Sequence, residues 1–467
     1  MLRDLLKRTS DIEMNRYSLT RRDALRLTLG ASLARLIPFK LQASRPVPSA
    51  SQLAWQRDEL AMFIHFGVNT FTNREWGDGK EDPAIFNPTR LDARQWARVA
   101  RDAGFKAMVL TAKHHDGFCL WPTKTTRHSV ARSPFRGGNG DVVREFVEAC
   151  RFENLKVGLY CSPWDRNSPV YGDSARYNDL FIEQLTELLT QYGPVHEVWF
   201  DGANGEGPNG KRQEYDWPRF WGHVRRLQPN AVMFSDAGPD IRWIGNERGV
   251  AGDTNWSTQD PSVVTVPGMS GDAVMRMLQD GDPNGTVWRP GETDVSIRPG
   301  WFYHPAEDAR VKSVDDLVEI YFTSVGRNSK LLLNVPPSPD GVLHDADVSR
   351  LTGMRQRLNA LFAENQTQIF RRSWRPTGRS GILELELEGA RPVSILDARE
   401  DITRGQVVAH YSIEAENAGT WTTLARGTTI GYRRLHRIPG VTVSRLRLTV
   451  EEGLAEPVDI SLRAWRG

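Results

Sequence analysis

From about residue 50 onwards, the chain alternates between short apolar runs and longer segments with helical periodicity. The apolar runs, which we expect to be strands, cover residues 59–69, 105–118, 156–165, 195–202 and 231–238. Between them the apolar residues recur with the period of an amphipathic helix, at residues 91–104, 141–155, 175–193 and 217–230. Apolar strands that are separated by helices of this length are typical of a parallel sheet.

This alternation fits either a (β/α)8 barrel or a doubly wound sheet. We favour the barrel because polar residues follow each expected strand, and a barrel collects its site from the ends of many strands. A glycine-rich phosphate-binding fingerprint is missing after the first strand. Residues 241–313 predict long irregular loops, and they precede a helix at 314–328, a last strand at 329–341 and a final helix at 345–365.

The pattern changes after about residue 366. Stretches such as "GILELELEGARPVSILDARED" alternate apolar and polar residues with a period of two and are separated by turn residues. This pattern predicts an antiparallel β-sandwich. We therefore expect a (β/α)8-like barrel over residues 51–365 and a β-sandwich over residues 366–467, which braces the barrel.

Residues 1–50 differ from both the expected barrel segment and the expected sandwich segment. Arg21 and Arg22 precede a moderately apolar run and a stretch rich in Pro, Ser and Ala, which resembles a twin-arginine export signal. Arg26 and Arg35 interrupt the run, so it is too short to span a bilayer. We expect export to the periplasm or the exterior. The alternative is an N-terminal extension without a signal function, in which case the protein stays in the cytoplasm.

Composition narrows the range of functions. A chain of 467 residues is long enough for two or more domains, and a net charge of +2 with no basic patch argues against nucleic-acid binding. The three cysteines, Cys119, Cys150 and Cys161, are too few for a disulfide framework and lack zinc-ligand spacing, so we expect buried thiols. The 15 tryptophans suit either a core or the apolar faces of sugar rings.

Candidate chemical groups gather where the expected strands end. They are His65, Glu75 and Trp76 after the first strand, His114, His115 and Asp116 after the second, Tyr160 and Trp164 after the third, and Trp199 and Asp201 after the fourth. The stretch 287–304 adds Glu292, Asp294, Arg298, Trp301 and His304. Dispersed carboxylates, histidines and tryptophans without a phosphate loop are suited to binding a sugar and cleaving a glycosidic bond.

Two of these features have other interpretations. Asp201 at the end of a strand could simply cap the following turn. His114 and His115 could bind a metal, form a structural pair or bind sugar hydroxyls. Adjacent strand residues point to opposite faces and chelate one ion poorly, so we favour hydroxyl binding.

Six stretches together resemble glycoside hydrolase family 29, the α-L-fucosidases, in the order of that family. They are "MFIHFGVNTFTNREW", "GFKAMVLTAKHHDGFCLWPTKTTRHSV", "VGLYCSPWD", "EVWFDGANG", "SDAGPDIRWIGNE" and "GRNSKLLLNVPPSPDG". The resemblance implies a barrel followed by a β-sandwich, a retaining mechanism, and no metal or other cofactor. It places Asp201 on the nucleophile, and it places His65, Glu75, Trp76, His114, His115, Tyr160 and Trp199 on positions that hold fucose, with Cys161 as an alternative to Tyr160.

The general acid/base is harder to assign from the resemblance. The stretch "WRPGETDVSIRPGWFYH" looks like the subgroup that prefers α-1,3- and α-1,4-linked fucose on branched glycans, and Glu292 falls on its acid/base. Asp294 is the competing residue, while Arg298 and Trp301 are expected to contact substrate. Three alternatives stay open: a carbohydrate-binding protein that has lost its chemistry, an unselective fucosidase, and a metal-dependent hydrolase that uses His114 and His115. The oligomeric state is not predicted.

Overall fold

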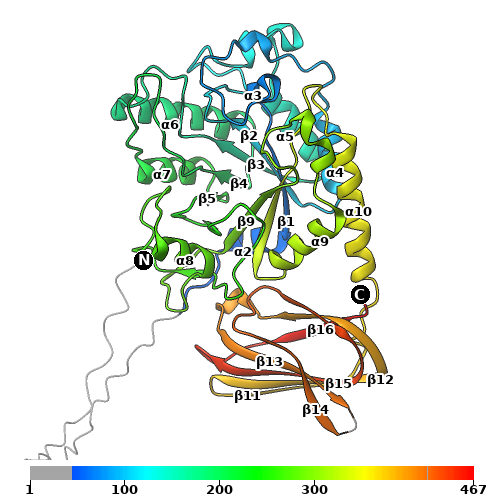
Figure 1. Cartoon of the computed structure of the whole chain (residues 1–467). Helices are drawn as coiled ribbons and strands as arrows, with labels where there is room; N and C mark the ends of the chain where they lie inside the picture. The colour runs from blue at the N-terminus through cyan, green and yellow to red at the C-terminus, as the bar shows by residue number, and fades with distance from the viewer. Residues whose placement is uncertain (1–44, 418) are drawn as a thin grey trace, which may run out of the picture. The chain divides into compact units, whose positions relative to one another are not determined.

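The structure, a computed structural model, describes residues 45–417 and 419–467 (Figure 1). Arg21 and Arg22 of the expected export signal lie outside the described residues. Eight parallel strands form one sheet, and six antiparallel strands form a second sheet near the C-terminus. None of the helices in the described ranges is long and apolar enough to cross a membrane.

The eight parallel strands form a nearly closed barrel. In sheet order they are β5 (Val232–Phe234), β4 (Glu197–Trp199), β3 (Lys156–Cys161), β2 (Ala107–Lys113), β1 (Leu60–Ile64), β10 (Ser329–Asn334), β9 (Gly291–Ser296) and β6 (Arg242–Trp243). A parallel bridge between Phe234 and Ile241 connects the two ends of this order. The prediction of a (β/α)8-like barrel is thus confirmed.

Helices surround the barrel strands, and several begin at an aspartate. They are α2 (Ala50–Asp58), α3 (Val68–Thr72), α4 (Ala93–Asp102), α5 (Val142–Phe152), α6 (Ser174–Gln191), α7 (Trp217–Leu227), α8 (Asp272–Asp280), α9 (Val314–Thr323) and α10 (Asp345–Leu361). The side chains of Asp92, Asp141, Asp173 and Asp216 cap α4 to α7 by accepting a backbone N–H of the first turn. Such caps satisfy donors that a helix N-terminus leaves unpaired.

Alternation along the strands separates two layers of core. On β3, Tyr160 packs inside the barrel with Phe63 and Trp199, whereas Leu159 and Cys161 belong to the outer layer between strands and helices. Successive strand residues point to opposite faces, so this division follows from the backbone alone. It places Tyr160, and not Cys161, on the side where the barrel can hold a ligand.

The segment predicted to be irregular, residues 241–313, contains more regular structure than expected. It supplies β6, α8 and β9, and a small antiparallel pair of β7 (Thr258–Gln259) and β8 (Val287–Trp288). These strands were not predicted from the sequence because β6 is only two residues long and β9 reads "GETDVS", which has few apolar positions. The consequence is that Glu292 and Asp294 stand on a barrel strand, not on a loop.

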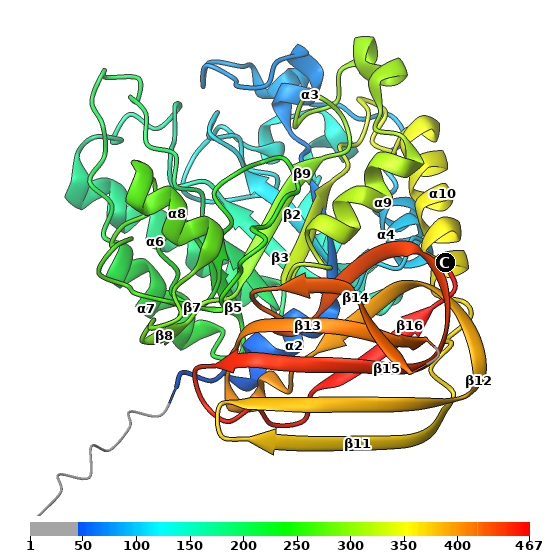
Figure 2. The same ribbon diagram turned by 60° about the horizontal axis from the view of Figure 1, so that its bottom comes forward.

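The C-terminal strands form the expected β-sandwich, with a core of its own (Figure 2). They are β11 (Ile369–Thr377), β12 (Ser380–Arg399), β13 (Val408–Asn417), β14 (Thr420–Gly427), β15 (Arg434–Gly453) and β16 (Ser461–Trp465). The first half of β12 pairs with β11 and its second half with β16, and register shifts interrupt its pairing with β15. These shifts let the long strands take part in both layers.

Charged groups connect the sandwich to the N-terminal end of the barrel. The guanidinium of Arg433, in the sandwich, donates to both carboxylate oxygens of Glu59 (2.9 and 3.1 Å) and to the hydroxyl of Tyr321 (2.6 Å). Glu59 directly precedes β1, at the end of the barrel opposite the loops that follow the strands. The sandwich therefore contacts the barrel away from the strand ends that carry the candidate site.

Candidate active site

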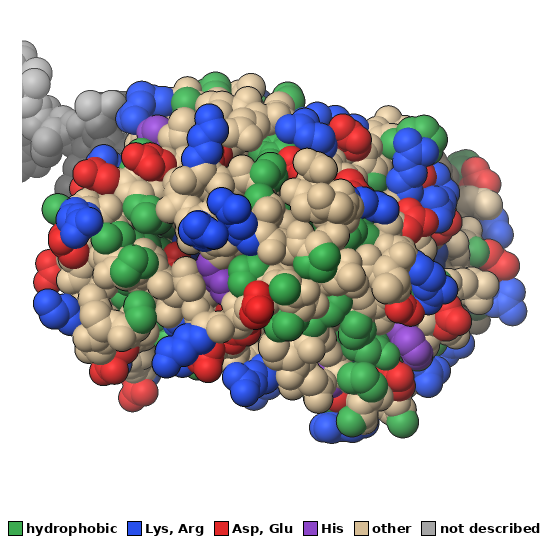
Figure 3. Space-filling model, turned by 90° about the horizontal axis from the view of Figure 1, so that it is seen from above, with side chains coloured by type: hydrophobic (Ala, Val, Ile, Leu, Met, Phe, Trp, Pro, Cys, Tyr) green, Lys and Arg blue, Asp and Glu red, His purple; other side chains and the backbone are tan. Residues whose placement is uncertain are grey.

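A cavity of about 400 Å³ opens at the carboxyl ends of the barrel strands. The space-filling view looks onto this face of the barrel, where histidine atoms are visible in a hollow near the centre (Figure 3). The residues that line the cavity are Phe63, His65, Glu75, Trp76, His114, His115, Trp199, Asp201, Ala203, Glu247, Asp294 and Trp301. Eight of the eleven predicted site residues, namely His65, Glu75, Trp76, His114, His115, Trp199, Asp201 and Trp301, are brought together here.

Asp201 lies directly after β4, and its carboxylate is held in one orientation. Its Oδ1 accepts the backbone N–H of Ala203 (2.7 Å), and its Oδ2 accepts the hydroxyl of Tyr160 (3.1 Å). The Nε2 of His115 is 3.7 Å from the same Oδ2. A quarter of the side chain (26%) stays exposed, so Asp201 caps the turn after the strand and still presents an oxygen to the cavity.

The three histidines of the cavity are buried and neutral. Burial lowers the pKa of His65 to about 3, although a 2.8 Å contact between its Nδ1 and the Oδ1 of Asn334 acts in the opposite direction. Burial also lowers the pKa of His115, and it lowers that of His114 well below the usual value. A neutral imidazole has one donor and one acceptor nitrogen, which is the combination that can bind hydroxyl groups.

Glu75 organises one wall of the cavity. Its Oε2 accepts the backbone N–H of Trp301 (2.8 Å), and its Oε1 accepts that of Phe302 (3.1 Å) and contacts the Nε2 of His304 (2.6 Å). These bonds fix the backbone that carries the Trp301 ring. On the same side Trp76 is 57% exposed, so a large aromatic face is available at the mouth of the cavity.

Two further carboxyl groups line the cavity, and both have raised pKa values. Partial removal of its carboxyl group from water raises the pKa of Glu247. The hydrogen bond from the Trp301 indole opposes this rise, and the negative charges of Asp201 and Glu75 add to it. Burial likewise raises the pKa of Asp294 well above its usual value, and Glu247 and Asp201 add to this. Asp294 accepts the indole N–H of Trp243 (2.8 Å) and is almost fully buried, whereas Glu247 is exposed.

The position of Glu292 corrects the role predicted for it. Its side chain is completely buried, and its Oε1 accepts the indole N–H of Trp199 (2.9 Å), one of the residues that line the cavity. Residues 292 and 294 both point into the barrel, but along β9 they are two positions apart, about 6–7 Å. Glu292 thus lies one layer deeper than Asp294, and it is not among the residues that line the cavity.

Two other predicted residues also lie outside the lining. Arg298 is buried and pairs with Asp347 (2.8 Å) and Asp308 (2.8 Å), so its guanidinium ties a loop to α10 and does not face the cavity. The prediction that Arg298 contacts substrate is corrected by these ion pairs. Tyr160 is buried below Asp201, and its hydroxyl reaches the nucleophile candidate instead of the open space.

Glu247 is a cavity residue that was not predicted from the sequence. It follows the short strand β6 and ends the stretch "WIGNE", where no role was expected for its carboxylate. The signal that could have found it is the same one that found Asp201, a carboxylate shortly after a barrel strand. The two residues of β6 are too few to give that signal in an apolar pattern.

The arrangement of the cavity suits a sugar better than a metal ion. Within the described ranges, no group of three or more His, Cys, Asp or Glu side chains is arranged to hold a metal. Asp116, adjacent to the histidine pair, instead accepts the backbone N–H of Phe118 (2.7 Å) and the side-chain amide of Asn69 (3.1 Å). His114 and His115 both line the cavity, so the strand end does turn both rings toward one space.

Comparisons with known proteins agree with this arrangement. The sequence model of the alpha-L-fucosidase family matches residues 76–360. The chain is 42% identical over 443 residues to alpha-L-fucosidase 1 of Arabidopsis thaliana, which covers 88% of this chain and 86% of the relative. A crystal structure of a glycoside hydrolase family 29 member from an unknown rumen bacterium superimposes with a TM-score of 0.83 at 42% identity, covering 90% of this chain and 77% of the other.

A second solved structure contains a sugar. It is a glycoside hydrolase family 29 fucosidase from Ruminococcus gnavus in complex with fucose, with a TM-score of 0.79 and 31% identity, covering 91% of this chain and 95% of the other. The family match spans more than half of the 467 residues, and the likeness to these structures includes both the barrel and the sandwich. The chain therefore belongs to the α-L-fucosidases of glycoside hydrolase family 29 and is a glycoside hydrolase.

Proposed function

We propose that the protein is an exo-acting, retaining α-L-fucosidase in which Asp201 is the nucleophile. The observation that carries the proposal is the position of Asp201: its carboxylate is partly exposed in a cavity lined by neutral histidines and aromatic rings. A pocket of about 400 Å³ suits one terminal sugar. The neutral nitrogens of the histidines can exchange hydrogen bonds with its hydroxyls, and the aromatic faces can cover its apolar side.

Glu247 takes the general acid/base role in this proposal, in place of Glu292. It lines the cavity together with Asp201, is open to solvent, and has a raised pKa. In the first step it donates its proton to the leaving oxygen while Asp201 attacks the anomeric carbon and forms a fucosyl ester. The ester removes the negative charge of Asp201, which lowers the pKa of Glu247, so its carboxylate can then accept a proton from the attacking water.

Asp294 is the second candidate for the acid/base. It also lines the cavity and has a raised pKa, but its carboxyl group is almost fully buried and is engaged by Trp243. A general acid has to reach the glycosidic oxygen of a departing sugar that lies partly outside the pocket. Glu247 therefore fits better than Asp294, and Asp294 is better placed to bind a hydroxyl of the sugar inside.

The preferred linkage in this proposal is α-1,3 or α-1,4 fucose on a branched glycan. The sequence resemblance to the selective subgroup supports it, as does the position of Glu247 in the long segment 241–313, beside Trp301 at 3.3 Å. A segment that supplies both the proton and surfaces for the departing sugar ties catalysis to the shape of that sugar. An unselective fucosidase is the alternative.

The experiment that tests the function is hydrolysis of an aryl α-L-fucoside, followed by NMR of the first-formed sugar. We expect release of α-L-fucose, because two displacements at the anomeric carbon retain its configuration. An aryl β-D-galactoside of the same leaving group serves as the control and is expected to remain intact. First-formed β-L-fucose would contradict the covalent role of Asp201, and no hydrolysis of the fucoside would favour a binding protein.

Export is a further part of the proposal, based on Arg21 and Arg22 in the sequence. Fucosidase activity is expected outside the cytoplasmic fraction of cells that express the full chain. Replacing both arginines with lysine is expected to move that activity into the cytoplasm, since the twin arginines are the recognised part of such a signal.

A further inference from the structure

The hydroxyl group of Ser162 lies between two polar groups just below the candidate active site. Its Oγ is 2.8 Å from the carbonyl oxygen of Trp164 and 2.8 Å from the Nδ1 of His115. Ser162 directly follows β3 and is completely buried. His115 in turn lines the cavity, with its other ring nitrogen, Nε2, 3.7 Å from the Oδ2 of Asp201.

Counting hydrogens decides which nitrogen of His115 is protonated. A carbonyl oxygen can only accept, so the single hydrogen of the Ser162 hydroxyl is donated to Trp164. The Ser162 oxygen must then accept from His115, and the hydrogen of a neutral imidazole has to sit on Nδ1. The Nε2 atom is left with a lone pair that faces the cavity.

We infer that Ser162 is a positioning residue: it holds neutral His115 in the Nδ1–H form, so that Nε2 accepts from a sugar hydroxyl and does not donate to Asp201. This inference rests on the proposed function, because it assumes that Asp201 is the nucleophile. This protonation state of His115 has two effects at the active site. The ring binds the substrate, and the carboxylate is not tied to the ring by a hydrogen bond.

The other form of the ring would weaken the nucleophile. Asp201 already accepts two hydrogen bonds, from the Ala203 backbone and the Tyr160 hydroxyl. A hydrogen on Nε2 of His115 would lie beside Asp201 Oδ2, which is 3.7 Å from that nitrogen. A third donor would stabilise the charged carboxylate and reduce its tendency to attack carbon.

The charges around His115 are consistent with a neutral ring. Burial lowers its pKa, the negative charge of Asp201 raises it, and the positive charges of Arg166 and Lys113 lower it again. The ring of His114 lies beside it with a centroid distance of 4.2 Å and is neutral as well. Because these charges act in opposite directions, the bond to Ser162 determines which nitrogen holds the hydrogen.

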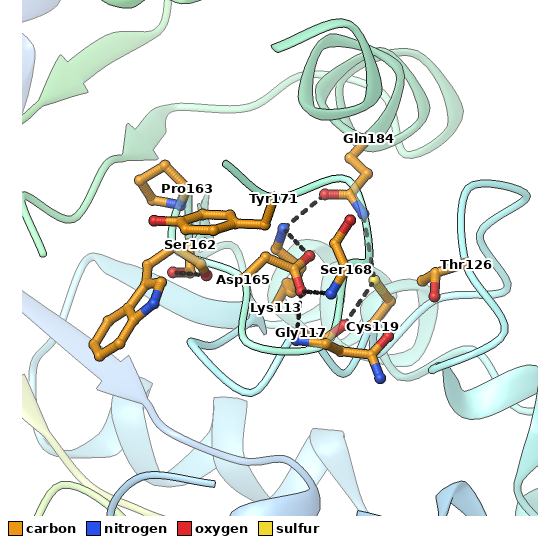
Figure 4. Close-up of polar contacts among 12 residues, drawn as sticks. Lys113, Gly117, Cys119, Thr126, Ser162, Pro163, Asp165, Ser168, Tyr171 and Gln184 are labelled. Carbon is orange, nitrogen blue, oxygen red and sulfur yellow. Dashed lines mark hydrogen bonds and ion pairs between the residues drawn. The ribbon is translucent and has the colours of Figure 1, made fainter. Parts of the chain in front are cut away.

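A buried ion pair fixes the loop on which Trp164 lies (Figure 4). The Oδ1 of Asp165 accepts the backbone N–H groups of Asn167 (3.0 Å) and Ser168 (2.8 Å), and its Oδ2 accepts from the Nζ of Lys113 (3.2 Å). Lys113 also donates to the Oε1 of Gln184 (2.7 Å) on α6. The carbonyl of Trp164, adjacent to Asp165, is thereby held where the hydroxyl of Ser162 can donate to it.

Ser162→Ala and Ser168→Ala form a matched pair for the test. Both serines are buried in the same loop, but the hydroxyl of Ser168 has no hydrogen-bond partner among the described residues, while its backbone N–H bonds to Asp165. Both variants lose one oxygen atom, and only Ser162→Ala removes the acceptor of His115. A loss that appears in the first variant alone is therefore due to the contacts of the Ser162 hydroxyl with His115, Trp164 and Tyr160, and the protonation state of His115 singles out the first of these.

We expect Ser162→Ala to lower kcat/KM for an aryl α-L-fucoside about 3- to 10-fold, the range for a hydrogen bond between neutral groups. The KM rises because Nε2 no longer accepts from the sugar. Ser168→Ala should keep the wild-type kcat/KM and KM.

The second measurement needs no turnover. Nitrogen-15 NMR of the full-length, resting enzyme identifies the protonated nitrogen of each neutral histidine, and the signals missing from a His115→Gln variant belong to His115. We expect protonated Nδ1 in the wild type and in Ser168→Ala, and protonated Nε2 in Ser162→Ala. Should Ser162→Ala fail to fold, the wild-type spectrum alone still shows which nitrogen of His115 carries the hydrogen.

The inference is overturned if His115 is protonated on Nε2 in the wild type, or if the two serine variants have the same kcat/KM. Failure of the proposed function is a different result. It would appear as continued turnover after removal of the Asp201 carboxylate, while the spectrum of His115 in the resting enzyme stayed as expected.

Discussion

Trp301 donates its indole N–H to the Oε2 of Glu247 at 3.3 Å. Its own backbone N–H is held by Glu75 at 2.8 Å, so the ring is a fixed connection between two carboxylates of the cavity. The bond to Glu247 stabilises the charged form of that carboxyl and opposes the effects that raise its pKa. The proposed acid/base is thus positioned, and partly tuned, by an aromatic residue that also lines the pocket.

Trp301→Phe tests this relationship. The variant keeps an aromatic ring but removes the donor, so the pKa of Glu247 rises and the basic limb of the pH profile of kcat/KM moves to higher pH. We expect about a fivefold loss of kcat/KM on natural glycans from the misplaced acid, the size of one ordinary hydrogen bond. Trp76→Phe is the control, since Trp76 lines the same cavity. A basic limb that stays in place would remove Trp301 from the tuning of Glu247.

Asp201→Ala should lose nearly all turnover on an aryl α-L-fucoside while its thermal midpoint stays close to that of the wild type. The side chain forms the covalent bond, and the remaining contacts of the pocket cannot replace it; removing a catalytic group typically costs about 10²–10⁴-fold. Azide in the buffer should restore some turnover by occupying the space of the carboxylate. A variant that keeps more than about a tenth of the activity would exclude Asp201 as the nucleophile.

Glu247→Gln and Glu292→Gln separate the two acid/base assignments. Glu247→Gln should damage natural glycans far more than aryl fucosides with good leaving groups, because a departing sugar needs a proton. Burial, together with the charge of Glu197, raises the pKa of Glu292 well above its usual value. The folded state thus favours a neutral carboxyl there, and Gln can still accept from Trp199. Glu292→Gln should therefore change kcat/KM only slightly, and a selective loss on natural glycans in this variant would restore the first assignment.

The sequence predicted most of this site because its main strands are apolar and end in polar residues. His65, His114, His115 and Asp201 all follow strands of that kind, so their convergence could be expected. Depth within the barrel is not encoded in such a pattern. Glu292 and Asp294 share one side of β9, and only the packing of Trp199 shows that Glu292 lies below the cavity. Arg298 was misassigned because Asp347, its partner, lies 49 positions further along the chain.

The neutral histidines predict how stability depends on pH. The pKa of His65 is about 3 in the folded protein and near 6.5 in a solvated chain. Between these values the unfolded chain binds more protons than the folded protein, so the free energy of unfolding falls as the pH drops from about 6.5 toward 3. His114 and His115 act in the same direction.

His65→Gln should make this dependence weaker, by about one proton in the slope of unfolding free energy against pH. Urea unfolding at a series of pH values between about 4 and 7 measures the slope. His410, on the sandwich and with a side chain 53% exposed, provides the control in His410→Gln, which should leave the slope unchanged. Equal slopes in the wild type and in His65→Gln would mean that His65 takes up its proton in the folded state.

The last prediction concerns linkage. Glu247 follows β6 in a segment that also supplies β7, α8 and β8, and Trp301 holds its carboxylate beside the mouth of the pocket. A sugar attached next to the fucose, as in a branched glycan, can bind against this segment and help to place the glycosidic oxygen at Glu247. Binding energy from a part of the substrate that does not react is then used in the transition state.

We expect kcat/KM for a Lewis-type trisaccharide to exceed that for 2′-fucosyllactose by at least about tenfold, within the range that a few contacts can discriminate. Glu247→Gln should reduce this ratio, because the extra contacts then have no acid to position. Comparable kcat/KM values for the two wild-type reactions would instead indicate a fucosidase in which the segment covers the barrel without selecting the leaving sugar.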